Sequence, residues 1–261
     1  MRCTACGLSF VTNPSTDYEN VYSEDYYAGR GADKLVDYAF ELEHPDLTIR
    51  RLEWEGIRKI VSAVKPLDAS TRWLDYGCGS GGLVRYLRGA GIDAEGYENS
   101  PIVPRLRTLG IPVLDVEDVD ARPDTYGVVT AIEVVEHLAE PRETFERIAR
   151  VLKPGGVAFF TTGNAERFAS DLIGWQYFIP EIHIALYEPR SLETALRLAG
   201  LQPKYAGWQP GYGDVITFKV LKNLKMNRLN PLHAVLPHTP LPAAVDRKFG
   251  VSAFPIGAKS A

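Results

Sequence analysis

Three glycines at alternate positions follow an acidic residue within residues 71–82, TRWLDYGCGSGG. Asp75 ends an apolar run, and a glycine-rich turn comes next. Glycine lets the backbone approach a ligand closely, and amides at the start of a helix point toward such a turn. Gly82 also permits the spacing of a dinucleotide fingerprint, so the turn alone leaves its ligand open. The three alternating glycines are Gly77, Gly79 and Gly81.

A second acid follows the next predicted strand. The turn leads into a predicted helix, 83–90, and then a strand, 93–97, after which Glu98 stands. A carboxylate at this place suits the two ribose hydroxyls of a nucleoside cofactor. Downstream come the stretch TAIEVVEHL, residues 130–138, and the turn LKPGG, residues 152–156.

Together these motifs resemble the class I S-adenosylmethionine-dependent methyltransferases, in the small-molecule branch that includes quinone and sugar methyltransferases. The resemblance covers residues 71–201 and four motifs in the family's order. It implies that the cofactor is S-adenosyl-L-methionine and that the product is S-adenosyl-L-homocysteine. The glycine turn would admit the amino-acid end of the cofactor, Asp75 would orient its ammonium group, and Glu98 would bridge its ribose hydroxyls.

Four further cofactor contacts are implied by the resemblance. Asp115 follows the third strand and would contact the adenine amino group, with the backbone amide of Val116 beside it. An acid at a strand end is also common for structural reasons, and Asp118 lies three residues on, so this assignment stays open. Ile132 and Glu133, at the end of the fourth strand, would pass beneath the methyl donor.

The pattern of short apolar strands alternating with helices predicts an α/β fold. We expect a Rossmann-like, seven-stranded, mostly parallel sheet with helices on both faces and an antiparallel last strand. The predicted strands are 72–76, 93–97, 112–114, 128–132 and 157–161, closed by an antiparallel pair, 203–208 and 214–221. The predicted helices are 83–90, 102–109, 142–152 and 191–199.

The chain divides into three predicted parts: an N-terminal segment, 1–66, a methyltransferase core, 67–221, and a C-terminal extension, 222–261. The first part begins with Cys3 and Cys6 in CTACG, which offer two of the four ligands of a zinc site. Relatives in this branch begin with a zinc ribbon whose second knuckle looks like this stretch. We expect a metal-free remnant, and no metal elsewhere.

An amphipathic helix over 49–64, ended by Lys65-Pro66, follows a tyrosine-rich stretch. In the family such a helical segment lies over the cofactor pocket as a lid. Tyr22, Tyr26 and Tyr27 are therefore candidate lid residues, with Tyr22 and Tyr26 as candidates for binding the acceptor, and packing on the edge of the core is the equal alternative.

Residues 163–188 join a predicted strand to a helix by a connection far longer than the usual ~2–6 residues. A long aromatic connection at the C-terminal edge of a parallel sheet is a common place for ligands. We expect it to bind the methyl acceptor. The candidate acceptor-binding side chains in it are Trp175, Tyr177, Phe178 and Tyr187.

Two histidines are candidates for the base that a hydroxyl acceptor requires, because imidazole titrates in a suitable range. His137 belongs to EVVEHL, where a structural role at a helix start is the favoured alternative. His183 belongs to the aromatic connection, where the base and the structural role stand even. An amine or carbon acceptor would need neither.

Composition and charge exclude several classes of function. The chain has 261 residues, 45% of them hydrophobic, and a formal net charge of -4, so no basic field calls for nucleic acid. The chain has three cysteines, no apparent signal peptide and no apolar run long enough for a membrane span. We therefore expect a cytoplasmic protein. From residue 219 onward seven Lys or Arg face one acid, Asp246. We favour a packed or dimer-forming tail over one that touches an anionic membrane.

The expected function is methyl transfer to a small molecule. A hydroxyl of a sugar or glycan precursor is the first expectation, because the remnant knuckle occurs in relatives tied to such pathways. The alternative is O-methylation of a phenolic, quinone-like or other natural-product acceptor, which suits the aromatic connection. An NAD-dependent oxidoreductase, in which EVVEHL would have no role, and a non-catalytic cofactor-binding module are the remaining alternatives.

Overall fold

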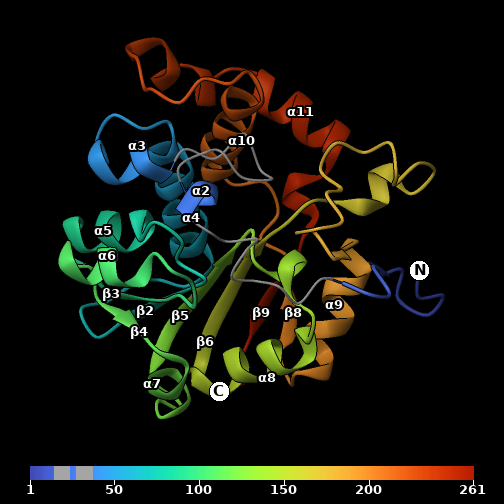
Figure 1. Ribbon diagram of the computed structural model, residues 1–261, viewed down its shortest axis with the longest axis horizontal. Helices are drawn as coiled ribbons and strands as arrows, with labels where there is room; N and C mark the ends of the chain where they lie inside the picture. Colours follow the sequence, from blue (N-terminus) through green and yellow to red (C-terminus); the bar gives the residue numbers. More distant parts are fainter. Residues whose placement is uncertain (15–23, 28–37) are drawn as a thin grey trace.

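A seven-stranded sheet forms the centre of the computed structural model, which describes residues 1–14, 24–27 and 38–261 (Figure 1). Its strand order is β4-β3-β2-β5-β6-β9-β8. β2 pairs in parallel with β3 and β5, β3 with β4, and β5 with β6, whereas β9 runs antiparallel to β6 and β8. The predicted Rossmann-like α/β fold with an antiparallel last strand is confirmed.

Most strands and helices lie close to their predicted bounds up to residue 199, but β6 begins at Leu152 and includes the predicted turn 152–156. The sheet contains β2 (Arg72–Tyr76), β3 (Asp93–Tyr97), β4 (Val113–Leu114), β5 (Tyr126–Ile132), β6 (Leu152–Thr161), β8 (Gln202–Lys204) and β9 (Ile256–Ala258). The longer helices are α4 (Arg50–Val64), α5 (Gly82–Gly89), α8 (Pro141–Val151), α9 (Pro189–Leu198), α10 (Pro210–Asn223) and α11 (Leu241–Phe249). Shorter ones are α2 (Glu24–Tyr27), α3 (Tyr38–Glu43), α6 (Val103–Thr108) and α7 (Val116–Asp120), with single turns η1 (Val135–His137), η2 (Ala165–Phe168), η3 (Pro231–Ala234), η4 (Leu236–His238) and η5 (Val251–Ala253).

Helices cover both faces of the sheet, with α4 and α5 on one side and α8 and α9 on the other (Figure 1). Successive strand residues point to opposite faces. Trp73 therefore packs with α4, α5 and α10, while its neighbour Leu74 packs with α8 and α9. Both side chains are fully buried, as are Val128 and Val129 in the next strand. This two-sided burial explains why the central strand β5 is apolar at most of its positions.

The predicted strand over 214–221 is wrong, because these residues belong to helix α10. β-Branched residues such as Val215, Ile216 and Thr217 favoured a strand, but tertiary packing overrides that preference. α10 lies against α4, where a Cβ added at Gly56 would stand 2.5 Å from the backbone oxygen of Gly211. This close approach buries α10 almost all round, which removes the one-sided pattern that identifies a helix from sequence.

The antiparallel partner comes instead from the C-terminal extension. β9 pairs Val157 of β6 with Ala258 and lies between β6 and β8. α11 packs against α10, as expected of a packed tail. A dimer contact and a membrane contact remain predictions. Residues of the predicted extension thus supply a strand of the core sheet, in contrast to the expectation that the sheet ends before residue 222. Among the described residues, no helix combines the length and apolar character that a membrane crossing needs.

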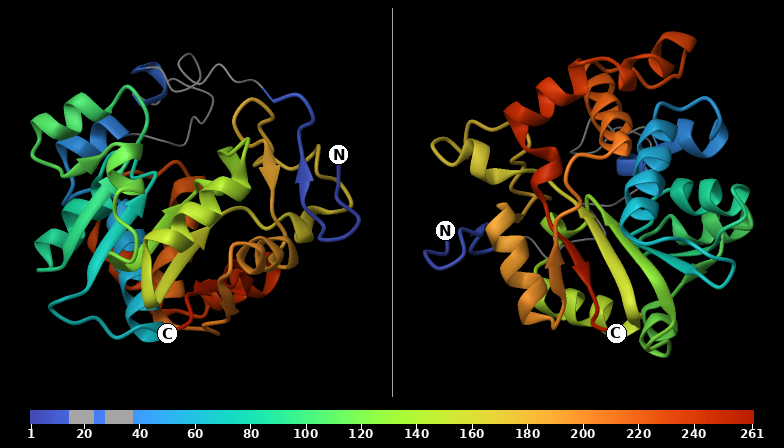
Figure 2. Two further views of the ribbon diagram at one scale, coloured as in Figure 1. Left: turned by 90° about the horizontal axis from the view of Figure 1, so that it is seen from below. Right: turned by 180° about the vertical axis from the view of Figure 1, so that it is seen from behind.

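The N-terminal residues add a two-stranded sheet beside the main one. β1 (Ser9–Phe10) pairs antiparallel with β7 (Ala185–Leu186), so the start of the chain lies beside the end of the aromatic connection (Figure 2). Cys3 precedes the turn 4–6 that leads toward β1, Cys6 is the last residue of that turn, and both are partly exposed. That they hold no zinc remains a prediction.

Candidate functional site

A cavity of about 1720 Å³ opens at the carboxyl ends of the parallel strands. Open parallel sheets bind their ligands at this edge. The last residues of four adjacent strands line the cavity, namely Tyr76, Tyr97, Ile132 and Thr161. The turn after β2, the connection 163–188 and helix α10 complete much of its wall.

The glycine turn borders the cavity through Gly77 and Gly79. Their φ angles are 75° and 52°, in the left-handed region that favours glycine. A Cβ at Gly77 would lie 2.6 Å from the side chain of Val134, so the position also excludes a side chain for lack of space. Gly81, with φ 69°, precedes α5 and does not line the cavity.

Glu98 lies directly opposite the turn. Its carboxylate accepts a hydrogen bond from the Gly79 amide at 2.8 Å and from the Asn99 amide at 3.1 Å, and it lines the cavity. Burial raises the pKa of Glu98, against the hydrogen bonds that favour its charged form. A partly desolvated carboxylate that faces a cavity favours hydroxyl donors, which is the role that the sequence predicts for Glu98.

Asp75 is buried beneath the turn and does not itself line the cavity. The hydroxyl of Thr130 on β5 donates to its Oδ1 at 2.8 Å. Burial raises the pKa of Asp75 to about 7, although this hydrogen bond acts in the opposite direction. The observed contact ties β2 to β5, and the expected contact with a cofactor ammonium group remains a prediction.

Asp115 and Val116 lie outside the cavity as the described residues bound it. Asp115 caps the start of the short helix α7, which the sequence did not predict, and its exposed carboxylate pairs with Arg107 at 2.7 Å. Both observations correspond to the structural role that an acid at a strand end commonly has. Their expected adenine contacts remain predictions.

The end of β5 carries a charged pair that faces the cavity. Ile132 and Glu133 both line it, and Glu133 has a φ of 53°. The Glu133 carboxylate pairs with the ammonium group of Lys219 on α10 at 3.0 Å. Burial opposes ionisation of Glu133, but the charges of Lys219 and Lys222 outweigh it and hold its pKa well below the usual range.

Tyr177 links this pair to a second, buried carboxyl group. Its hydroxyl lies 3.0 Å from Oε2 of Glu133, contacts Oε1 of Glu136, and accepts the amide hydrogen of Gly163 at 3.0 Å. Burial and the charge on Glu133 raise the pKa of Glu136 to about 8. The Tyr177 hydroxyl has one hydrogen and cannot donate to two carboxylates at once. The three side chains are satisfied best when Glu136 is protonated and donates to the Tyr177 oxygen, while the Tyr177 hydroxyl donates to Glu133.

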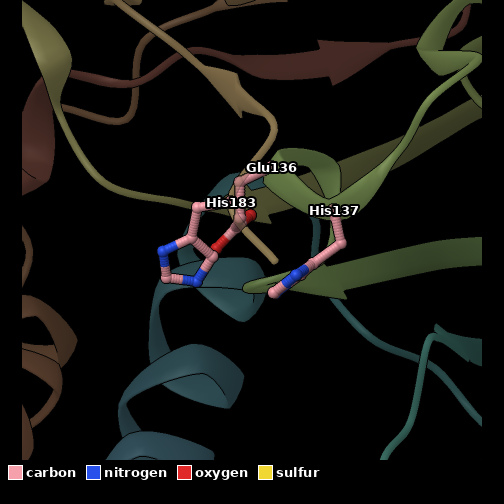
Figure 3. Close-up of side chains that lie close together, drawn as sticks. All are labelled: Glu136, His137 and His183. Atoms are coloured by element: carbon pink, nitrogen blue, oxygen red, sulfur yellow. The ribbon is translucent and has the colours of Figure 1, made fainter. Parts of the chain in front are cut away.

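Two histidines stand beside Glu136 (Figure 3). Nδ1 of His137 lies 2.8 Å from the carbonyl oxygen of Ile182, and Nδ1 of His183 contacts the carbonyl oxygen of Tyr177. A carbonyl accepts only, so each Nδ1 carries a hydrogen and the lone pair of each neutral ring is on Nε2. Within the described part of the chain, Glu136, His137 and His183 also bring potential metal ligands within 4.8 Å of one another. Sequence reasoning expected no metal, and this remains a prediction.

A column of aromatic rings leads along the connection 163–188 to His183. Phe168 stacks on Trp175 at 4.4 Å, Trp175 on Tyr177 at 4.8 Å, and Tyr177 on His183 at 4.2 Å, between ring centroids. All four residues line the cavity. The expected acceptor-binding residues Trp175 and Tyr177 are thus in the wall.

The other two predicted members of that wall lie elsewhere. Phe178 follows a turn closed by its own amide and the Trp175 carbonyl, and it does not line the cavity. Tyr187 packs in the core against Phe145 and is almost fully buried, because the chain enters β7 just before it and turns its side chain toward α8.

Tyrosines cover the cavity from the N-terminal side. Tyr26 and Tyr27 on α2 line it together with Tyr38 on α3, and the three rings contact one another. The Tyr27 hydroxyl donates to Ser100 Oγ at 2.7 Å, next to the segment that carries Glu98. Tyr22 lies outside the described residues.

Sequence reasoning missed three charged residues of the site. Arg50 lines the cavity and pairs with Glu41 at 3.1 Å and Glu53 at 2.6 Å. Lys219 was hidden by the wrong strand over 214–221, although Pro210, at the first helical position, was a usable signal for a helix. Glu136 was visible in EVVEHL but had no assigned role.

These features define a class. The cavity lies at the carboxyl edge of a Rossmann-like sheet. It is bordered by a glycine turn after the first strand of this sheet and by an acid after the second, as in class I S-adenosylmethionine-dependent methyltransferases. The chain belongs to the family described as "Methyltransferase domain", whose model matches residues 48–205.

Named relatives point to the small-molecule branch. The ubiquinone biosynthesis O-methyltransferase of Ralstonia nicotianae is 30% identical over 172 residues, which cover 59% of this chain and 69% of the relative. That of Bordetella pertussis is 33% identical over 150 residues, covering 51% of this chain and 62% of the relative. The match to the latter thus spans under two thirds of the relative.

Solved structures agree on the fold. A chain in the complex of the Haloferax volcanii Trm112 methyltransferase activator with a methyltransferase has a TM-score of 0.55, 22% identity, and coverage of 91% of this chain and 97% of its own. A methyltransferase from Archaeoglobus fulgidus has a TM-score of 0.51 and 17% identity, with 80% and 94% covered.

Proposed function

We propose that this enzyme transfers a methyl group from S-adenosyl-L-methionine to a hydroxyl of a phenolic or quinone-like small molecule. The observation that carries the proposal is the column of rings from Phe168 to His183 along the cavity wall. Flat rings stack on a flat acceptor at little entropic cost. The names of the matched relatives, ubiquinone biosynthesis O-methyltransferases, support the same acceptor class.

The residues around the glycine turn fit the cofactor. Gly77 and Gly79 bring the backbone to the edge of the cavity without side chains, and Glu98 supplies a partly buried carboxylate for ribose hydroxyls. The Glu98 carboxylate accepts a hydrogen bond from the Gly79 amide. The ribose hydroxyls of a bound cofactor would replace this hydrogen bond or share the carboxylate with it. When bound, S-adenosyl-L-methionine supplies the activated methyl group. The protein's part is to hold the acceptor in line and to exclude water.

His183 is the base in this proposal. Its Nδ1 hydrogen is committed to the Tyr177 carbonyl, so Nε2 is the atom that accepts the acceptor's proton. A phenol has a pKa of about 10, near that of tyrosine, so imidazole can take its proton far more readily than that of an aliphatic hydroxyl. This difference in pKa favours a phenolic acceptor over the sugar that the sequence first indicated. The remaining support for a sugar acceptor is the Cys3–Cys6 pair.

Calorimetry and product analysis test the proposal. S-Adenosylmethionine and S-adenosylhomocysteine should bind and raise the melting temperature, since they stabilise the folded state, and NAD should not. Glu98→Ala should weaken cofactor binding by about 1.5–3 kcal/mol, the size of a charge-assisted hydrogen bond. With a panel of catechols, phenols and free sugars, methyl transfer should be confined to the aromatic hydroxyls.

Three results would reject parts of the proposal. Binding of NAD alone would indicate an oxidoreductase. Cofactor binding without transfer to any acceptor would favour a non-catalytic binding module, and transfer to sugars alone would restore the first expectation. A cytoplasmic location, based on the three cysteines, belongs to the same proposal.

A further inference from the structure

Residues 222–249, which we call the cap, concentrate exposed apolar side chains. Of the fourteen exposed large hydrophobic residues in the described part of the chain, six lie in this short segment. A soluble surface normally scatters such residues singly, and a concentration of them marks an interaction site. The six are Leu224, Met226, Leu232, Val235, Leu241 and Phe249.

The same segment is strongly basic. It carries five Lys or Arg and one acid, Asp246, within a chain of net charge -4. The Asp246 carboxylate is engaged locally, since it accepts hydrogen bonds from the amide and hydroxyl of Ser252. From Lys222 to Val245 there is no acid at all. The charge of Lys222 already acts on Glu133, so the cap combines exposed apolar side chains with four further cations.

The cap forms the outermost layer over helix α10 and projects from the body at the top of Figure 1, and again in the right-hand view of Figure 2. Its inner side reaches the cavity, because Lys222, Leu224 and Phe249 belong to the cavity wall. A surface that contacts the cap therefore also adjoins the cavity.

We propose that the cap docks the protein on an anionic membrane surface. Lys and Arg side chains bind lipid headgroups while neighbouring leucine and phenylalanine side chains enter the boundary with the acyl chains. A second copy of this chain is a poorer occupant, because a two-fold interface would place each basic cap against another basic cap. The inference does not depend on which acceptor is methylated.

Vesicle sedimentation tests the proposal, with phosphatidylcholine vesicles that either contain or lack phosphatidylglycerol. The protein should pellet with the anionic vesicles alone and be released by high salt, because salt screens the attraction. Lys225→Glu should lower binding by roughly 5-fold or more, the effect of one cationic side chain near such a surface. Leu232→Asp should lower it by roughly the same factor, because it replaces an apolar contact by a charge that anionic headgroups repel. Neither residue lines the cavity, so both variants should retain transfer to a water-soluble acceptor.

Matched substitutions elsewhere provide the controls. Leu198 on α9 is 72% exposed, compared with 75% for Leu232, so Leu198→Asp adds the same charge at an equally exposed leucine. Lys204→Glu on β8 is the corresponding control for Lys225→Glu. Both controls should pellet as the unchanged protein does, and all variants should melt near the same temperature.

Several outcomes would overturn the proposal. These are no pelleting with anionic vesicles, equal pelleting with neutral ones, or equal losses in the cap and control variants. A dimer in light scattering that Leu232→Asp dissociates would instead identify a second copy as the occupant. Each of these results is separate from cofactor binding and methyl transfer, so failure here leaves the proposed function standing.

Discussion

His137 and His183 lie close together, and we expect their alanine variants to differ in turnover. Their ring centroids are 4.9 Å apart, and both hold Nδ1 against a carbonyl of the connection 163–188. His183→Ala should lower turnover of a phenolic acceptor by ~10²–10⁴-fold, the range for loss of a general base, with little change in cofactor affinity. His137→Ala should lower the melting temperature more and turnover less. The reverse pattern in steady-state assays and calorimetry would make His137 the base.

Asp75 makes stability depend on pH. Its pKa is about 7 in the folded protein because of burial, whereas an unfolded chain has the ordinary value of about 3.9. Between these values the folded state keeps a proton that the unfolded state has lost, so the free energy of unfolding falls as pH rises from about 4 to 7. The slope contributed by this single group is at most about 1.4 kcal/mol per pH unit.

Asp75→Asn removes that contribution while keeping an oxygen for the hydroxyl of Thr130. In urea denaturation across this pH range, the variant should gain stability relative to the unchanged protein as pH rises. If the two curves of unfolding free energy run parallel, the carboxyl group ionises normally and is not desolvated as described.

At the scale of elements, the contact between α4 and α10 tolerates no added atom. A Cβ at Gly56 would meet the Gly211 carbonyl, which belongs to the backbone and cannot turn away. Gly56→Ala should therefore destabilise the protein by about 1–3 kcal/mol, despite alanine's better helix propensity. Gly89 in α5 has open space around it, so Gly89→Ala is the control and should be neutral or stabilising. Thermal denaturation of both variants decides, and a stabilised Gly56→Ala protein would contradict the close packing.

The elements also show what could be predicted from sequence. β2 and β3 match the predicted bounds because turn residues on both sides of each strand mark where it begins and ends. Helix α10 could not be recognised, since it is buried on nearly all sides and rich in residues that also suit strands. Glu133 contacts both Lys219 and Tyr177, and the contact with Lys219 depends on helix α10. This part of the site could therefore not be predicted from the sequence. Gly77, Gly79 and Glu98, which line the cavity, could be placed from sequence because a glycine turn and an acid after a strand are local patterns.

On the scale of the whole molecule, the cavity joins distant parts of the chain. Its wall takes Tyr26 from α2, Glu98 after β3, His183 from the connection and Phe249 from α11. The proposed cofactor side and the proposed acceptor side therefore share one chamber, and residues of the cap line part of it. Sequence patterns identify local pieces of such a chamber but give no information on which distant pieces face each other.

The position of β9 has a consequence for how the protein is made. β9 is the last strand along the chain, yet it lies inside the sheet, between β6 and β8. While the polypeptide emerges from the ribosome, β6 has an unpaired edge and β8 has no neighbour until residues 256–258 are synthesised. We therefore expect nascent chains to expose an open strand edge until β9 has been made, an interval in which edge pairing makes aggregation a hazard.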